Sequence, residues 1–150
     1  MDVELAADAF ELGGESYPVE PAKVPVRLDV SRTASGHALR LRLEARLSGP
    51  CMRCLTGSTF PVEVDAREVE HPSASDEELT SPYVEEGVLD LGAWAHDAMA
   101  LALPQTLLCR PDCAGLCPEC GVVLNDVDPA THVHESAPDP RWAKLRELQE

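Results

Sequence analysis

Four of the six cysteines in this 150-residue chain fall within twelve residues, in the order C-x3-C-x3-C-x2-C from Cys109 to Cys120. So dense a cluster constrains the fold strongly, because neighbouring thiols bind a metal ion, form disulfides or act in redox chemistry. The stretch from Cys117 to Gly121, C-P-E-C-G, has the form of a zinc knuckle. In a knuckle two thiolates flank a tight turn, and the glycine lets backbone N–H groups approach the sulfurs. We therefore expect a chain organised around metal sites.

Two further pairs of candidate ligands flank this cluster. Cys51-x2-Cys54 lies upstream and His132-x-His134 lies downstream. Thiolates and imidazoles suit zinc, and a structural zinc ion takes four protein ligands, so eight ligands provide for two ions. The favoured division is Cys51, Cys54, Cys109 and Cys113 for one ion, and Cys117, Cys120, His132 and His134 for the other.

Other divisions stay open. One zinc ion could bind the four cysteines from Cys109 to Cys120 and leave the outer pairs spare, giving one ion instead of two. The histidine pair could also be a chance feature of an exposed loop.

The start of the chain, Met1-Asp2-Val3-Glu4, lacks the basic and apolar segments of a signal peptide, and no apolar run approaches the roughly 18 residues that span a bilayer. We therefore expect a cytoplasmic protein without a membrane partner. In the reducing cytosol, clustered cysteines are metal ligands or redox groups more often than disulfides.

The net charge of −15 is unevenly distributed. Residues 1–22 carry six acidic residues and no basic one, and residues 61–90 carry ten acidic residues and one basic. Residues 23–53 reverse the sign, with seven basic residues against two acidic. The candidate RNA- or partner-binding residues in this cationic band are Arg40, Arg42, Arg46 and Arg53. An acidic protein attracts basic partners and repels nucleic acid except where such a band meets it, although a solvated strand face is the ordinary interpretation.

Alternation of apolar and polar residues predicts antiparallel strands over 24–30, 38–47 and 60–69, with the first cysteine pair at a hairpin tip. Asp90 is suited to cap a helix that ends before Pro104. The apolar residues of that helix are Leu91, Trp94, Ala95, Ala98, Leu101 and Ala102. The predicted fold is α+β: a small antiparallel sheet or meander packed by one amphipathic helix, then a zinc-stapled, cysteine-rich module and a short terminal helix.

Three regions follow from this pattern. Residues 1–22 are expected to form an acidic, loosely docked arm with a short helix around Leu5 to Phe10. Residues 23–104 hold the sheet and helix, with a loop at 71–82. Residues 105–150 hold the zinc module, with a hairpin arm from Val122 to Asp128 and a terminal helix that begins at Asp139.

No motif in the chain supports catalysis. Zinc deaminases pair P-C-x-x-C with an upstream H-x-E, and the chain has no H-x-E and no proline before Cys117. It also lacks H-E-x-x-H, G-x-S-x-G and phosphate-binding glycine loops. We expect a protein that is not an enzyme and has no small-molecule substrate.

In combination, four motifs resemble the YceD family. They are C-x-R-C-L from Cys51, D-x6-D-A-x2-L-A-L-P from Asp90, C-x3-C-x-G-L-C-P-x-C-G from Cys109, and D-P-R-W-x-x-L from Asp139. Many similar chains carry C-x-C where His132-x-His134 stands, an exchange that preserves zinc coordination. Members are linked to accumulation and processing of large-subunit ribosomal RNA, and their genes commonly neighbour that of a small basic large-subunit ribosomal protein.

The resemblance implies a role in ribosome biogenesis, which the residues could serve in two ways. The acidic surface could bind a basic large-subunit ribosomal protein. The arginine band could contact precursor ribosomal RNA. Alternatively, the chain could be a zinc-dependent redox sensor or chaperone-like protein that responds to thiol oxidation.

Overall fold

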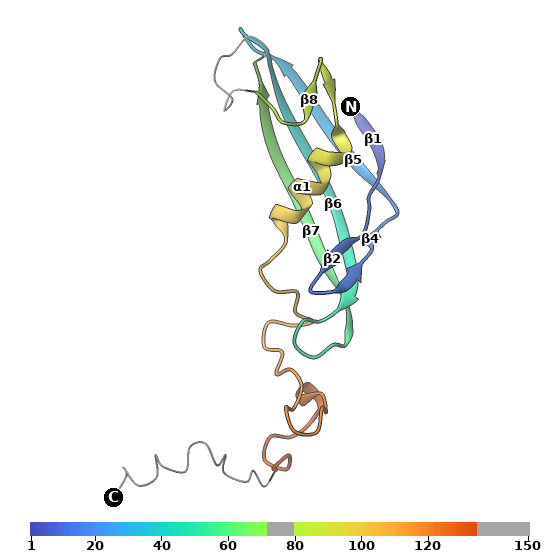
Figure 1. The fold of residues 1–150 in the computed structure, drawn as a ribbon, viewed down its shortest axis with the longest axis vertical. Helices are drawn as coiled ribbons and strands as arrows, with labels where there is room; N and C mark the ends of the chain where they lie inside the picture. Colours follow the sequence, from blue (N-terminus) through green and yellow to red (C-terminus); the bar gives the residue numbers. More distant parts are fainter. Residues whose placement is uncertain (72–79, 135–150) are drawn as a thin grey trace, which may run out of the picture. The chain divides into compact units, whose positions relative to one another are not determined.

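The computed structural model describes residues 1–71 and 80–134 (Figure 1). The chain divides into two compact units, Met1–Cys113 and Ala114–Glu150. The predicted C-terminal module begins at residue 105. The first unit instead runs to Cys113, so it includes Cys109 and Cys113. Among the described residues, no helix has the length and apolar character needed to cross a lipid bilayer.

Three long antiparallel strands form the centre of the first unit: β5 (Lys23–Arg32), β6 (His37–Pro50) and β7 (Gly57–Glu70). β6 lies between the other two, so that Leu41 stands opposite Leu28 of β5 and Ala66 of β7. These strands include all three predicted ranges, because alternating apolar residues can bury one face of a sheet while polar residues stay in water. The predicted antiparallel sheet is therefore confirmed.

The N-terminal residues do not form the expected loose arm. They form four short strands: β1 (Asp2–Ala6), β2 (Phe10–Leu12), β3 (Glu15–Tyr17) and β4 (Val19–Glu20). β1 pairs with β5, and β4 pairs with β6. β2 and β3 form a hairpin whose turn, Gly13-Gly14, has φ angles of 63° and 89°. The predicted helix from Leu5 to Phe10 is wrong, because β1 pairs with β5 up to Ala6 and Phe10 begins β2, where Phe10 is buried.

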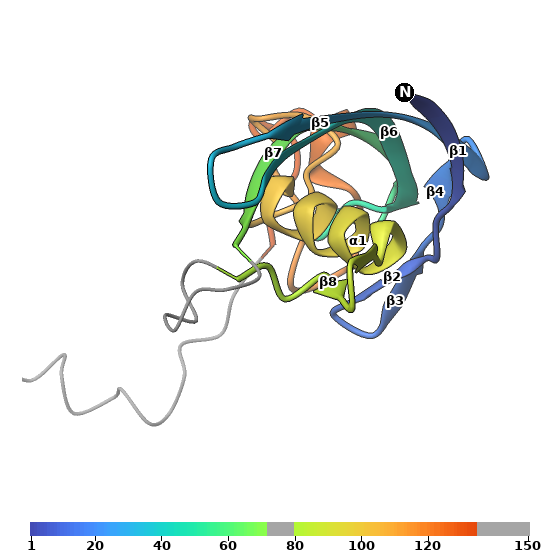
Figure 2. The same cartoon turned by 90° about the horizontal axis from the view of Figure 1, so that it is seen from above.

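The helix α1 (Leu91–Ala102) lies inside the curve of the sheet (Figure 2). The carboxylate of Asp90 accepts a hydrogen bond from the N–H of Ala93 at 2.9 Å, which confirms the predicted cap. Trp94 is 2% exposed, so its burial contributes on the order of 3 kcal/mol to the core. The buried face is made of Trp94, Ala95, Ala98 and Met99. Leu101, predicted to share this face, is instead 88% exposed.

The remaining elements are small. β8 (Val84–Glu85) and β9 (Val88–Leu89) form a hairpin before α1. In the second unit, a single bridge between Leu116 and Val123 and a short 3-10 helix (Leu124–Asp126) stand where a hairpin arm from Val122 to Asp128 was predicted. The predicted terminal helix and most of the loop at 71–82 lie outside the described residues.

Candidate metal centres

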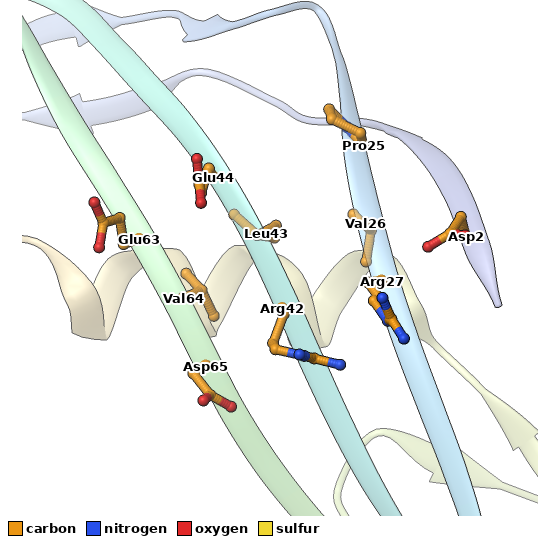
Figure 3. Close-up of a pocket in the computed structure, with 10 residues that line it drawn as sticks. All are labelled: Asp2, Pro25, Val26, Arg27, Arg42, Leu43, Glu44, Glu63, Val64 and Asp65. Carbon is orange, nitrogen blue, oxygen red and sulfur yellow. The ribbon is translucent and has the colours of Figure 1, made fainter.

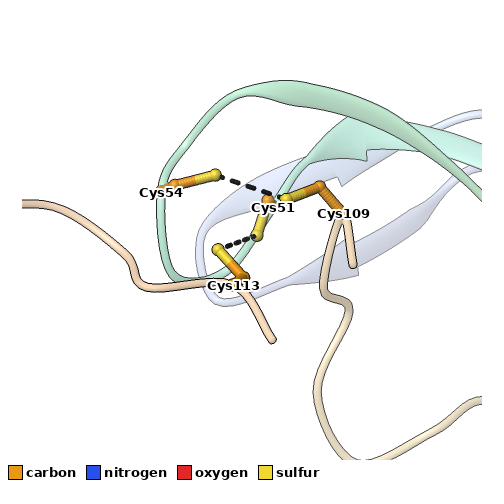
Figure 4. A group of neighbouring side chains, drawn as sticks. All are labelled: Cys51, Cys54, Cys109 and Cys113. Atoms are coloured by element: carbon orange, nitrogen blue, oxygen red, sulfur yellow. Dashed lines mark hydrogen bonds between the residues drawn. The ribbon is translucent and has the colours of Figure 1, made fainter. Parts of the chain in front are cut away.

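The first group of thiols gathers at the turn between β6 and β7. Cys51 and Cys54 lie in this turn, and Cys109 and Cys113 come from the segment that follows α1 (Figure 4). The Sγ atoms of Cys51 and Cys113 are 3.8 Å apart, and those of Cys54 and Cys109 are 3.6 Å apart. Four thiolates around a tetrahedral zinc ion would stand about 3.8 Å apart, given a Zn–S bond of about 2.3 Å. The spacing therefore fits one tetrahedral ion and is far too long for a disulfide.

Local backbone geometry builds this site. The N–H of Leu55 donates to the carbonyl of Cys51 at 2.9 Å, and Leu55 takes up the left-handed conformation with φ of 59°. The N–H of Met52 donates to the carbonyl of Leu107 at 2.9 Å, and the N–H of Leu107 donates to the Met52 Sδ at 3.4 Å. This pair of bonds holds the segment that carries Cys109 against the turn.

A buried tyrosine supports the same turn from the sheet side. The hydroxyl of Tyr17 donates to the carbonyl of Pro50 at 2.9 Å, and its ring is 1% exposed. A Cβ atom on Gly49 would stand 2.3 Å from this ring, so glycine is required for the close approach. These contacts hold the strand ends beside Cys51 without involving the four thiols.

The pKa values of two thiols of this group, Cys51 and Cys109, are shifted in opposite directions. Burial raises the pKa of Cys51, but hydrogen bonds from backbone groups, including the N–H of Arg53, outweigh burial and lower it to about 6. Burial raises the pKa of Cys109 to about 12, together with hydrogen bonds to the thiols of Cys54 and Cys113. Four thiols this close cannot all ionise without a neutralising cation. A bound divalent metal would supply that charge.

The second group lies within the second unit and mixes sulfur with nitrogen. The Sγ of Cys117 is 3.3 Å from Nε2 of His134, and the Sγ of Cys120 is 3.6 Å from Nε2 of His132. The two Nε2 atoms are 3.0 Å apart. Ligand atoms around a tetrahedral zinc ion with two sulfurs and two nitrogens stand about 3.3–3.8 Å apart, so this group also fits one ion.

The second knuckle repeats the geometry of the first. The N–H of Gly121 donates to the carbonyl of Cys117 at 2.9 Å, and Gly121 has φ of 73°. Hydrogen bonds from backbone groups of Cys120 and Glu119 and from the His132 side chain lower the pKa of Cys117 to about 6. The second site is more open than the first, since Cys120 is exposed whereas Cys51, Cys54 and Cys113 are buried.

Glu119 is a supporting residue that the sequence analysis missed. Its Oε2 is 3.7 Å from Nδ1 of His134, while Nε2 of the same ring faces Cys117. A carboxylate on the far nitrogen of a metal-binding histidine fixes the ring and raises its basicity. The sequence did contain one indication of this role: a glutamate lies between the two cysteines of a knuckle whose other two ligands are histidines.

All eight predicted ligands thus fall into two groups of four, along the division that was favoured from spacing. The alternative set, the four cysteines from Cys109 to Cys120, is split between the two units. Each group could hold one metal ion, and the geometry alone does not decide which metal that is.

Three arginines of the band, Arg40, Arg42 and Arg46, lie on the outer face of the sheet, away from α1, as Figure 3 shows for Arg42. Arg53 lies in the turn between β6 and β7. Nε and Nη2 of Arg40 donate to the two carboxylate oxygens of Asp65 at 2.7 and 2.6 Å. Arg42 donates to Asp29. These hydrogen bonds lower the pKa of both carboxyl groups. Arg46 and Arg53 are exposed and form no ion pair with another described residue.

On this face basic and acidic residues are mixed, with both like and unlike charges facing each other across neighbouring strands. The basic residues are Lys23, Arg27, Arg40, Arg42, Arg46 and Arg67, and the acidic residues are Asp2, Glu4, Glu20, Asp29, Glu44, Glu63 and Asp65. Six positive and seven negative charges sum to −1, so −14 of the net charge of −15 resides on the rest of the chain.

Most of the chain, including both metal groups, matches a known protein family. The sequence model of the family described as "Large ribosomal RNA subunit accumulation protein YceD" matches residues 39–149, which include every predicted metal ligand. The chain belongs to the YceD family. No solved structure matches the chain.

Relatives of this YceD chain occur in mycobacteria. Uncharacterized proteins of Mycobacterium bovis and Mycobacterium tuberculosis are 37% identical to it over 132 residues, covering 85% of this chain and 62% of each relative. An uncharacterized protein of Mycobacterium leprae is 38% identical over 103 residues, covering 65% of this chain and 46% of the relative. The chain therefore spans less than two thirds of the length of these relatives.

Proposed function

We propose that this YceD protein is a non-enzymatic, cytoplasmic ribosome biogenesis factor that promotes accumulation of large-subunit ribosomal RNA by binding a basic ribosomal protein of the large subunit. Family membership supports the ribosomal role. The observation that carries the choice of partner is the charge distribution. The outer sheet face is nearly neutral and the remaining chain holds fourteen excess negative charges, a distribution suited to a basic protein and unfavourable for RNA.

We propose that zinc occupies both ligand groups and has a structural role. Four protein ligands in each group leave no open position for substrate or water, unlike catalytic zinc sites. The first ion would join the turn between β6 and β7 to the segment after α1. The second would hold together a unit with almost no regular secondary structure among its described residues. Native mass spectrometry with and without a chelator tests this directly, and two ions per chain are expected.

The partner proposal predicts salt-sensitive binding. Purified ribosomal proteins of the large subunit, ranked by net positive charge, are titrated against the zinc-loaded chain at about 50 and 200 mM salt, a range over which screening of exposed charges increases. We expect at least one basic protein to bind and its affinity to fall with salt. An acidic ribosomal protein is the matched control. An affinity that does not change with salt concentration, or no binding at all, would contradict the proposal.

Direct contact with precursor ribosomal RNA is a second candidate, favoured by one observation. Arg46 and Arg53 are exposed and form no ion pair with described residues, so they are available to phosphate groups. Crosslinking to ribosomal RNA is compared between the parent and Arg46→Glu with Arg53→Glu. The control is the double variant Arg40→Glu with Arg42→Glu, which changes the net charge by the same amount but replaces arginines that already form ion pairs. If neither double variant changes the crosslinking, RNA contact through this band is excluded.

A further inference from the structure

β7 is an edge strand over its whole length. It pairs with β6 from Gly57 to Glu70, and no other strand in the described part of the chain pairs with it (Figure 1). An edge of this length presents a row of backbone donors and acceptors that a further extended segment can bind.

The hydrogen bonding of the sheet shows which backbone groups face this open edge. Ser48 of β6 donates its N–H to the carbonyl of Pro18, on the side away from β7, so the pair Ser48–Thr59 is not hydrogen-bonded. Antiparallel pairs alternate between hydrogen-bonded and non-hydrogen-bonded types. Every second residue of β7 from Thr59 therefore turns its backbone away from β6. Pro61 is one of them, which agrees with the rule that proline in a sheet places its missing N–H on the open side.

The residues that direct both an N–H and a carbonyl to the open edge are thus Thr59, Glu63, Asp65, Arg67 and Val69. Their side chains lie on the outer face of the sheet. A segment added here would place alternate side chains on the outer face and on the face that α1 covers.

The two faces of this edge differ in chemistry. On the outer face, Glu63 stands directly opposite Glu44 in a non-hydrogen-bonded pair, and both carboxylates are exposed (Figure 3). Like charges so placed are destabilising, and a basic side chain between them would relieve this. β7 as a whole carries four acidic residues and one arginine.

The inner side of the edge offers apolar surface beside charged residues. A pocket of about 400 Å³ lies between β7 and α1, lined by Val64, Trp94, Ala98 and Leu101 and also by charged residues of β7 such as Glu68. Leu101 is 88% exposed there, so its apolar surface is open to solvent beside the edge. An apolar side chain of an added segment would cover it.

We propose that the open edge of β7 binds an extended segment of a partner protein in which basic and apolar residues alternate. Backbone hydrogen bonds from the outward-facing residues extend the sheet by one strand. Basic side chains of the segment lie beside Glu63 and Glu44, and apolar side chains cover Leu101. A second copy of this chain is disfavoured as the occupant, because two β7 edges would bring acidic residues together. The proposal rests on the proposed function and specifies where its basic partner binds.

The test uses the zinc-loaded full chain and a labelled octapeptide of alternating lysine and valine as the probe. Glu63→Pro removes one outward N–H that β6 does not use, and Glu63→Gln removes the same charge but keeps the N–H. We expect the proline variant to bind the peptide about tenfold more weakly than the glutamine variant, as loss of one hydrogen bond and local fit predicts. Glu44→Gln controls for charge on the neighbouring strand.

Measurements on the parent chain remain decisive if Glu63→Pro does not fold. The peptide should protect the amides of Glu63, Asp65 and Arg67 from hydrogen exchange. A peptide N-methylated on alternate residues along one edge should bind at least about tenfold more weakly, since it cannot complete the ladder. An alternating glutamate–valine peptide should not bind.

Three results would overturn the proposal. These are equal peptide affinity for the proline and glutamine variants, protection at other strands, and β7 amides already protected in the free chain by its own residues or by a second copy. The same variants are then titrated with the basic ribosomal protein. If that protein binds parent and Glu63→Pro equally, the edge is excluded and the proposed function stands. If it binds neither, the proposed function fails, and the peptide result still decides the edge.

Discussion

Replacing Leu55 by glycine tests the knuckle geometry of the first metal site. Leu55 has φ of 59° and is 63% exposed, whereas the second knuckle has Gly121 at the same place with φ of 73°. A left-handed conformation costs a non-glycine residue about 1–2 kcal/mol. Leu55→Gly removes this cost, but the more flexible unfolded chain offsets roughly 0.5–1 kcal/mol of the gain.

The leucine side chain contributes little in return. With about a third of its surface buried, it supplies about 0.5–1 kcal/mol of the 1.5–3 kcal/mol that full burial would give. Leu55→Gly should therefore be close to the parent in stability. Leu55→Ala keeps the backbone cost and loses the burial, so it should be about 0.5–1 kcal/mol less stable than the parent.

The assay is urea unfolding of the zinc-loaded protein at a fixed free zinc concentration, because a bound ion adds to the apparent stability. Gly121→Ala is the reciprocal variant. Its new Cβ would meet nothing within 4 Å, so any loss comes from the backbone alone and should be about 0.5–1 kcal/mol. The reasoning is refuted if Leu55→Gly is less stable than Leu55→Ala, or if Gly121→Ala matches the parent.

Three further predictions concern other parts of the chain. Gly49→Ala should destabilise the protein by about 1–3 kcal/mol in urea unfolding because its Cβ would overlap the Tyr17 ring, whereas Gly57→Ala, with open space at its Cβ, should be close to neutral. Glu119→Gln should lower the affinity of the second site for its metal ion by roughly tenfold or more, measured in competition with a chromophoric chelator, because the carboxylate lies beside His134 of that site. The affinity of the first site should not change. The pKa of Asp65 is lowered from 3.8 by its hydrogen bonds with an arginine, so its stabilising effect is present above that value and lost as the pH falls through the lower folded-state value. The stability difference between the parent and Asp65→Asn should accordingly shrink on acidification below about pH 4, and a constant difference would contradict this.

The central sheet could be predicted because its signal is local. Leu39, Leu41 and Leu43 alternate with charged residues, and this pattern is compatible with only one way of burying a strand face. The cap at Asp90 was equally local. The N-terminal strands were missed because β2, β3 and β4 are each two or three residues long. Their stability comes from burying Phe10 and Tyr17 against distant residues, which no local pattern records.

The metal ligands could be predicted from spacing, since short cysteine pairs bind one ion only when a second pair completes the tetrahedron. Spacing favoured one way of combining the short ligand pairs into two sites but could not prove it. Cys51 and Cys113, for example, are 62 positions apart and come together only in the folded chain. The left-handed conformation of Leu55 had no signal in the sequence. Leucine rarely adopts it, and here the hydrogen bond to Cys51 requires it.

The arginine band shows why a run of like charge along a sequence is not a charged surface. Arg40 and Arg42 are separated in sequence from Asp65, yet the antiparallel register brings the acidic residues of β7 alongside the arginines of β6. Only Arg46 and Arg53 keep an exposed positive charge without an ion pair to a described residue among the four arginines of the band. Two such charges attract RNA weakly, because phosphate binding strengthens with the number of charges neutralised. The excess negative charge elsewhere opposes RNA over a longer range. The basic protein that we propose as partner would meet neither obstacle, and the proposed binding site for it is the backbone edge beside the facing carboxylates of Glu44 and Glu63.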